Sequence, residues 1–442
     1  MRRIGGVVLG SFACWALALL YACVGSDPDA STVLPDASTS SSGSTSGGGS
    51  SSGNGGSSSS GNVTDAGTDA GPTCTSDEEL CNGACLAKSA KATSKDHCGA
   101  CGHSCGGGDC KLAVCGPALV VADILDERGY DVMDGYVYFV TNDDPHTKSD
   151  VFRCSVSGCA PAEQLYSATA NGTSISDLHA TGGVIAFHGN RVGSSGGGIK
   201  ICPATGCLGN DIGGNGYRHI YAATKGRFFL SGGRNDSPIQ MIECHPSDAG
   251  DAGDPGCTQT KLVDEGSGTV GYPQRGGADG THLTYGRSNL DGGTELVLCD
   301  PNTGCDGGTV VVTDAPTANI ISGGKLLLMT SGSESQPTGN IRQCDLPCTT
   351  PPSDLVPSTQ YPVEIVADEK DLYWLSPAYD AILTCPLTGC PAGPKEVLTG
   401  LGNRPSELRV DEGFVYWSSE SPSDDSGLHR DIRRVAKPLA PK

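Results

Sequence analysis

The sequence has few basic residues for its length. Its 442 residues include 29 Lys and Arg against 50 Asp and Glu, which gives a formal net charge of −21. Proteins that bind nucleic acids present a basic surface to the phosphates, so this composition argues against a nucleic-acid partner. The acidic excess instead suits a secreted domain that its charge keeps soluble. Binding of Ca²⁺ is a second interpretation of the same excess.

The N-terminus lacks an apolar run long enough for a stable membrane span. Arg2 and Arg3 precede an apolar stretch from Ile4 to Leu20, which has the length and flanks of a secretory signal. This stretch leads into Leu20-Tyr-Ala-Cys23, which resembles the bacterial lipobox, where the cysteine is lipidated and becomes the mature N-terminus. The resemblance implies a signal peptide over 1–23 and a lipid anchor at Cys23. Cys14 is the competing cysteine, and ordinary signal-peptide cleavage is the alternative.

Apolar residues are scarce from 24 to 72. Ser, Gly, Thr, Asp, Ala and Pro make up almost all of this segment, with Ser-Gly runs at 40–61 and Asp-Ala-Gly units at 65–71. Such a composition buries too little apolar surface to fold. A flexible coil of about 50 residues has a reach of roughly 35 to 45 Å. We therefore expect a disordered tether that lifts the folded part off the bacterial cell envelope, at the outer membrane or the cell surface.

Cysteine, in contrast, is abundant. Setting aside Cys14 and Cys23 leaves 20 of the 22 cysteines, and an even number in an exported chain is typical of disulfides. Twelve of them form six pairs of near neighbours, which we expect to be bonded: Cys154 with Cys159, Cys202 with Cys207, Cys244 with Cys257, Cys299 with Cys305, Cys344 with Cys348, and Cys385 with Cys390. Metal ligation by these pairs is the alternative, but no His accompanies them at ligand spacing.

The other eight cysteines define a small module over 73–116. They are Cys74, Cys81, Cys85, Cys98, Cys101, Cys105, Cys110 and Cys115. A segment with so few apolar residues needs covalent staples, and structural disulfides of open connectivity are the favoured interpretation. The alternatives are a redox Cys98-Gly-Ala-Cys101 motif and a zinc site that adds Cys81 and Cys85, which would leave four cysteines over. The segment 96–105 resembles cysteine-rich modules in secreted proteins of myxobacteria and their relatives, which implies a surface location.

A short strand pattern recurs seven times from residue 117 to the C-terminus. It is seen as Gly135-Tyr-Val-Tyr-Phe-Val-Thr141 before Cys154, and as Asp371-Leu-Tyr-Trp-Leu375 before Cys385. The equivalent position recurs every 43 to 55 residues, at Tyr138, Ala186, Phe229, Thr284, Leu327, Tyr373 and Tyr416. A period of this length, with several short strands per unit and no helical pattern, predicts a β-propeller. The fold class is therefore all-β, with the cysteine-rich module preceding a propeller over 117–442.

Each repeat contains an inner strand, a second strand, a third strand ending at the first cysteine, and an outer strand. Turn residues such as Pro203-Ala-Thr-Gly206 lie between paired cysteines, so each pair would clamp the hairpin between the third and outermost strands. The seventh repeat has neither a cysteine pair nor an outer strand. The segment Ala118 to Ile124 is placed to supply that strand and close the ring.

Two second strands carry a family resemblance. Leu372-Tyr-Trp-Leu375 and Val415-Tyr-Trp-Ser418 resemble YWTD-type and TolB-like propeller repeats, whose usual blade number is six. We count seven blades, with six as the alternative if a weak fourth or fifth repeat is an insertion.

The connections between second and third strands are the candidate binding face, because they gather at one mouth of a propeller channel. Their polar residues are Asn142, Asp143, Asp144, His146, His188, Asn190, Arg191, Arg234, Asn235, Asp236, Arg287, Asn289, Asp291, Tyr379, Asp380 and Glu420. Ordinary solvated loops are the competing interpretation. Asp248, Asp251 and Asp254 suggest a calcium loop, but their spacing of three misses the alternate ligands that such a loop needs.

No nucleophile stands beside a base at a recognised spacing in these connections, and His-Glu-x-x-His does not occur there. We therefore expect no catalytic residue, no metal and no cofactor. The favoured function is a monomeric, lipid-anchored envelope protein whose propeller binds protein or glycan partners. The alternatives are a propeller-type hydrolase or lyase that uses the channel mouth, and a purely structural envelope component.

Overall fold

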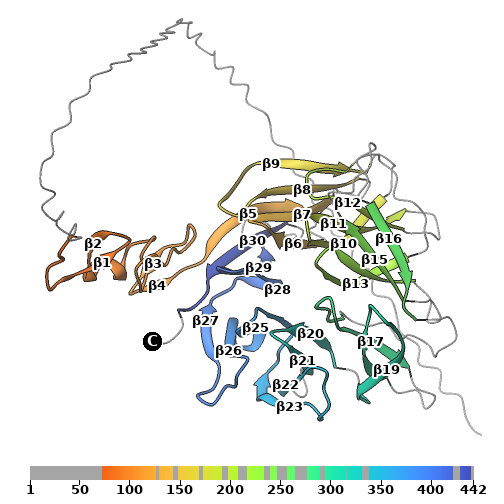
Figure 1. Cartoon of the computed structure of the whole chain (residues 1–442). Helices are drawn as coiled ribbons and strands as arrows, with labels where there is room; N and C mark the ends of the chain where they lie inside the picture. The colour runs from red at the N-terminus through yellow and green to blue at the C-terminus, as the bar shows by residue number, and fades with distance from the viewer. Residues whose placement is uncertain are drawn as a thin grey trace, which may run out of the picture. The chain divides into compact units, whose positions relative to one another are not determined.

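The computed structural model describes residues 72–125, 129–142, 148–168, 173–191, 198–207, 217–232, 239–245, 256–263, 276–288, 294–314, 316–330, 338–421 and 429–439. They form a disulfide-rich module and a seven-bladed β-propeller, whose sheets follow one another around a common centre (Figure 1). Within these ranges, no helix has the length and apolarity needed to cross a bilayer.

The first three blades are built from neighbouring stretches of chain. Their strands are β6 (Tyr130–Met133), β7 (Tyr136–Asn142), β8 (Ser149–Ser155) and β9 (Gly158–Ser167); β10 (Thr173–Thr181), β11 (Val184–Arg191) and β12 (Gly198–Pro203); and β13 (Tyr217–Thr224), β14 (Arg227–Gly232), β15 (Ile239–His245) and β16 (Gly256–Lys261). Every pairing within these sheets is antiparallel, with the first strand of each blade innermost.

The next three blades follow the same order. Their strands are β17 (Leu283–Ser288), β18 (Thr294–Asp300) and β19 (Gly304–Val312); β20 (Ala318–Ser322), β21 (Lys325–Thr330), β22 (Thr338–Asp345) and β23 (Ser353–Gln360); and β24 (Glu364–Ala367), β25 (Asp371–Ser376), β26 (Ala381–Pro386) and β27 (Lys395–Thr399), with the short helix η3 (Pro377–Tyr379) between β25 and β26. In the fourth blade, the segment around Gly277 takes the innermost place, where its carbonyl accepts a hydrogen bond from Thr284 N at 2.9 Å.

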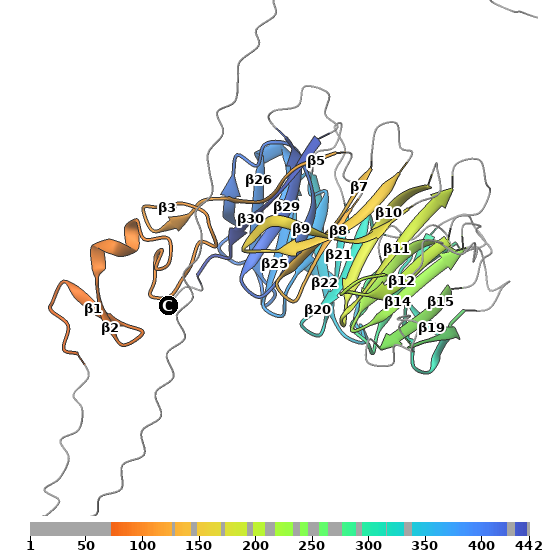
Figure 2. The same ribbon diagram turned by 90° about the horizontal axis from the view of Figure 1, so that it is seen from above.

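The seventh blade joins the two ends of the chain. Its strands are β28 (Asn403–Val410), β29 (Phe414–Glu420), β30 (His429–Ala436) and β5 (Ala118–Leu125). β5 pairs antiparallel with β30, with Val121 opposite Ile432 and Ala118 opposite Arg434 (Figure 1 and Figure 2). This confirms the prediction that an N-terminal strand completes the last blade, and seven blades are present rather than six.

The recurring second strand supplies the core. All seven positions at which the repeats were aligned are buried, and they pack between neighbouring blades because alternate side chains point to opposite faces of each sheet. The two Tyr-Trp repeats also satisfy their indole groups. Trp374 Nε1 donates to Thr359 Oγ1 at 3.2 Å, and Trp417 Nε1 donates to the Leu401 carbonyl at 3.2 Å.

Disulfides clamp six of the blades. The structure contains the bonds Cys154–Cys159, Cys202–Cys207, Cys244–Cys257, Cys299–Cys305, Cys344–Cys348 and Cys385–Cys390. In every case the first cysteine lies in the third strand of its blade. Each bond therefore closes a short loop of chain next to the outer edge of the sheet, where strands fray most easily.

The module is held by four further disulfides, namely Cys74–Cys85, Cys81–Cys101, Cys98–Cys110 and Cys105–Cys115. Its regular elements are short: β1 (Glu78–Cys81), β2 (Ala84–Ala87), the helix η1 (Lys88–Ala92), β3 (Cys110–Lys111) and β4 (Val114–Cys115). Cys98 and Cys101 belong to different bonds, and all eight cysteines are oxidised. None of them is left as a redox pair or a metal ligand in this structure.

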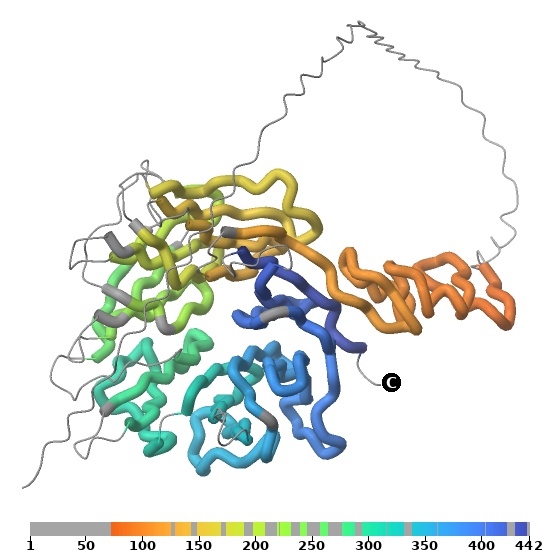
Figure 3. Tube along the Cα trace, turned by 180° about the vertical axis from the view of Figure 1, so that it is seen from behind, coloured from red at the N-terminus to blue at the C-terminus, as the bar shows by residue number. Residues whose placement is uncertain are grey.

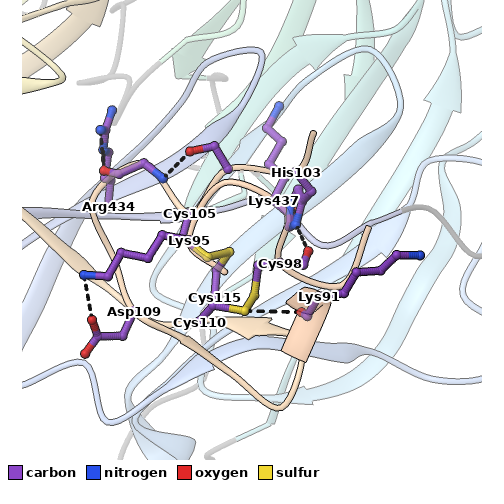
Figure 4. Close-up of a disulfide and its surroundings, with 12 residues drawn as sticks. Lys91, Lys95, Cys98, His103, Cys105, Asp109, Cys110, Cys115, Arg434 and Lys437 are labelled. Atoms are coloured by element: carbon purple, nitrogen blue, oxygen red, sulfur yellow. Dashed lines mark hydrogen bonds and ion pairs between the residues drawn. A yellow bond between two sulfur atoms is a disulfide. The ribbon is translucent and has the colours of Figure 1, made fainter. Parts of the chain in front are cut away.

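The module contacts the seventh blade where β29 begins and β30 ends (Figure 4). Cys105 and Cys115 are buried in one cluster with Ala436. Arg434 Nε donates to the Gly106 carbonyl at 3.0 Å, and its guanidinium lies 4.3 Å from the centre of the Phe414 ring. The other six blades have a local disulfide at this point. The third and outer strands of the seventh blade come from opposite ends of the chain, so the module takes the place of that clamp.

Gly106→Ala tests this contact. A Cβ at Gly106 would lie 2.3 Å from Phe414 Cε1, whereas Gly83 has a similar positive φ and nothing within 4 Å. Gly83→Ala should cost only the strain of a left-handed alanine, about 1 to 2 kcal/mol. We expect Gly106→Ala to lower the non-reducing melting temperature further, and to speed proteolysis of the link between module and β5. Equal proteolysis rates in the two variants would show that the module does not hold the seventh blade.

Candidate functional site

The two ends of the propeller channel differ in their connections. First and second strands are joined by two-residue turns at 134–135, 182–183, 225–226 and 323–324, and the disulfides lie at the same end. Second and third strands are joined at the opposite end, through 143–148, 192–197, 233–238, 289–293, 331–337, 377–380 and 421–428. The first end also carries the longer connections between third and outer strands, such as 246–255 and 387–394. The opposite end, which we call the loop end, carries the connections between second and third strands.

Two of the predicted face residues lie inside the fold. Asn142 is buried, and its Oδ1 accepts a hydrogen bond from Ser149 Oγ, which itself accepts one from Ile175 N at 3.1 Å. This chain of bonds joins the first blade to the second. His188 is also buried, with Nδ1 3.5 Å from Ser176 Oγ. Both side chains serve contacts between strands.

Other predicted residues lie at the loop end with partners from the protein. Arg287 Nη2 is 2.8 Å from Glu295 Oε2, and Glu420 Oε1 is 3.0 Å from Arg404 Nη1. Asp380 accepts a hydrogen bond from Leu401 N at 3.1 Å, and Tyr379 is half exposed. Several predictions fall outside the described residues or on side chains that are not described: Cys23, Asp143, Asp144, His146, Asn190, Arg191, Arg234, Asn235, Asp236, Asp248, Asp251, Asp254, Asn289 and Asp291.

A charged cluster in the channel was not predicted from the sequence. The inner-strand residues opposite the repeat positions are Asp131, His179, Ala222, Gly277, Ile320, Val366 and Arg409. Charged or polar residues thus come from the seventh, first and second blades, and small or apolar residues come from the other four. The side of the channel formed by these three blades is therefore polar and the other side is apolar, although the repeats are alike in sequence pattern.

Arg409 is the centre of the charged part. Its Nε lies 3.2 Å from Asp131 Oδ1, and its Nη1 lies 3.7 Å from Glu364 Oε1. Burial would lower the pKa of this guanidinium, but the carboxylates of Asp131, Glu407 and Glu364 outweigh it, so the pKa of Arg409 lies above its ordinary value. The positive charge is permanent and already matched by protein carboxylates.

A second cluster of titratable side chains lies in the second and third blades. Asp177 sits at a bulge of β10 with φ 51°, and its Oδ2 is 3.6 Å from His219 Nδ1. Burial would raise the pKa of Asp177, but His219, His179 and His188 together hold it below the ordinary value. The rings of His188 and His219 are stacked with centroids 6.3 Å apart.

The described part of the propeller contains a small cavity beside Arg409 and a larger groove elsewhere. A cavity of about 250 Å³ lies among the inner strands of the third to seventh blades, with Ala222, Gly277, Ile320 and Arg409 in its wall. A larger groove of about 730 Å³ lies between β5 and the first blade. The cavity is of a size for water or a very small ligand, whereas the groove can take several side chains of a partner.

Replacing Arg409 tests whether the channel cluster is structural. The side chains of Arg409, Asp131 and Glu364 are only 16%, 17% and 13% exposed. Arg409→Met would remove the cation that faces both carboxylates and should cost about 3 kcal/mol of unfolding free energy, part of which Asp131→Asn should restore. In the control, Arg404→Met, the lost arginine is 83% exposed, so we expect a cost below about 1 kcal/mol. Equal losses in non-reducing chemical denaturation would contradict a structural cluster.

Comparisons with known proteins give no family. No family model and no curated protein matches the chain. A solved structure of prolyl endopeptidases is 12% identical with a TM-score of 0.48, over 73% of this chain and 51% of that one, so the chain spans about half its length. A nidogen/laminin complex is 15% identical with a TM-score of 0.36, over 56% of this chain and 86% of that one. A putative TolB from Agrobacterium tumefaciens is 13% identical with a TM-score of 0.34, over 54% of this chain and 83% of that one. At these identities the likeness is one of fold alone.

Proposed function

We propose that this protein is a non-catalytic binding propeller, exported and lipid-anchored at Cys23 to the bacterial cell envelope. The ring would serve as a platform for protein or glycan partners. The observation that carries the proposal is that the connections between second and third strands are longer than the turns between first and second strands, because longer connections on a rigid scaffold are where proteins place recognition residues. The tight turns and disulfides at the other end make that scaffold rigid.

The pairing of Arg409 and Asp177 argues against these two groups as general acids or bases. Arg409 is held by Asp131 and Glu364, and Asp177 is held by His219. A general acid or base must be able to exchange its proton with a substrate near neutral pH. The guanidinium of Arg409 stays charged, and the carboxyl of Asp177 stays ionised until well below neutral pH because its pKa is lowered.

Anchoring would follow from the N-terminal sequence. A lipid on Cys23, followed by a polar coil over 24–72, would hold the folded part near the membrane while leaving the ring accessible. Labelling of growing cells with an alkyne fatty acid tests this step. Cys23→Ser should abolish the label and Cys14→Ser should keep it. Label that survives Cys23→Ser would place the lipid elsewhere, and absence of label from the wild-type chain would show that the protein carries no lipid.

Capture from envelope extract tests the platform itself. The full-length chain with Cys23→Ser would be immobilised, and the retained proteins and glycans would be identified. Arg287→Glu breaks an ion pair at the loop end, and Lys325→Glu breaks the pair of Lys325 Nζ with Asp345 Oδ1 at the tight-turn end. A partner of the loop end should bind Arg287→Glu at least tenfold more weakly, about 1.4 kcal/mol, and Lys325→Glu normally. Equal loss in both variants, or no retained partner, would refute the platform.

A further inference from the structure

The seam where the ring closes contains the groove of about 730 Å³. β5 runs between the seventh and first blades there, as Figure 3 shows for the orange segment between the yellow and dark blue sheets. One wall is β5, and the other consists of β7, β8 and β9 of the first blade. We call this hollow the closing groove.

The backbone of β5 borders the closing groove. All residues from Leu119 to Ile124 line it in succession. Side chains of a strand alternate between two faces, so an unbroken series indicates that the edge of the strand itself is exposed to the groove. β5 is the last strand of its sheet, and β9 is the last strand of its own. Both therefore present N–H and C=O groups that no strand of their sheets pairs.

The corresponding space is bridged at two other seams. Cys207 N donates to the Leu165 carbonyl at 3.1 Å, and Cys305 N donates to the Leu262 carbonyl at 3.0 Å. These bonds tie the disulfide turn of one blade to the outer strand of the blade before it. Among the described residues, no such backbone bond joins Cys159 to β5. In the described part of the chain this bond is found at these two seams, and the closing seam is among those that lack it.

The floor of the closing groove is apolar. Phe139 and Phe152 stack with ring centroids 5.7 Å apart and both line it. Leu119 is 55% exposed, and the small side chains of Ala160 and Ala162 leave room above the rings. Such a floor favours aliphatic or aromatic side chains of a partner. The hydroxyl groups of a sugar would find few hydrogen-bond partners on this apolar floor.

One end of the closing groove is acidic. Asp123 and Asp150 both line it, and Asp150 Oδ2 is 3.0 Å from Lys148 Nζ. The other oxygen, Asp150 Oδ1, is buried and has no hydrogen-bond partner among the described residues. A buried acceptor left without a donor costs stability. A cationic side chain of a partner at this end would lie near both carboxylates.

We propose that the closing groove receives an extended segment of a partner protein, which adds to β5 as a further strand. Its apolar side chains lie over Phe139 and Phe152, and a Lys or Arg reaches Asp150. This mode combines main-chain pairing for affinity with side-chain pockets for specificity. The proposal rests on the proposed binding function but places this partner in the closing groove and not at the loop end. It narrows that partner to a protein segment, because a glycan has no main chain to pair.

Selection from a displayed library of random nine-residue peptides tests this. The full-length chain with Cys23→Ser is the target, and the enriched peptides are synthesised and measured by fluorescence anisotropy. We expect alternating apolar residues with a Lys or Arg near one end. Hydrogen exchange of the complex should show new protection of the amides from Val120 to Ala122, which a peptide bound elsewhere would not give.

Three variants decide the site. Ala162→Trp fills the closing groove and should weaken binding at least tenfold, whereas Ala392→Trp, at an exposed alanine beside the disulfide turn of the sixth blade, should change nothing. Asp150→Asn should weaken the binding of peptides that contain the Lys or Arg. When that residue of the peptide is replaced by norleucine, the wild-type chain and Asp150→Asn should bind the peptide equally well. Melting temperatures confirm that each variant is folded.

The opposite results are equally clear. A library that yields no binder, or binders that Ala162→Trp retains, would overturn the groove as a peptide site. Binding without protection of β5 would overturn strand addition. If Ala162→Trp still captures the envelope partner, the platform function stands and the groove is not its site. If no variant and no wild-type chain captures a partner, the platform function itself fails.

Discussion

The pairing of β5 with β30 is the constraint on which the rest of the structure depends. It joins residues near 120 to residues near 430, so the whole propeller must be in place before this ladder can form. Closing so long a loop costs conformational entropy, and hydrogen bonds and the buried cluster of Val120, Val121, Tyr130 and Ile432 must offset it. Without this ladder the third strand of the seventh blade would be an exposed edge, and Tyr130, Val137 and Phe139 of the first blade would lose the side chains of β5 that pack on them.

The disulfides have a different role, because they are local. Each repeat disulfide spans between 4 and 13 residues, so it removes little entropy from the unfolded chain. Its effect is to hold the hairpin at the outer edge of one blade. The seventh blade cannot have such a bond, and its ends are instead covered by the module through Arg434, Ala436 and Gly106. The module is thus part of how the ring closes, which its sequence alone did not indicate.

The sequence predicts the repeat well because the recurring strand has a period of two and its cysteine pairs are close together. The channel could not be predicted in the same way. Asp131, His179 and Arg409 come together only through the register of the inner strands, and that register is shifted by bulges such as the one between Ser406 and Arg409. Asn142 and His188 are residue types that often occur in binding loops, but both are buried and hydrogen-bonded to residues of other strands. Such bonds depend on neighbours that are distant in sequence.

Where a fold leaves hydrogen-bonding capacity unused is a better guide to binding than where charges gather. In the channel, Arg409 is matched by carboxylates, and any ligand there would first have to displace a charge pair in a setting of low dielectric. The closing groove presents the reverse situation, with a strand edge along β5, an apolar floor and the buried oxygen of Asp150. Ring closure by a strand from the other end of the chain places β5 beside the first blade, so the pairing that completes the propeller also forms one wall of this groove.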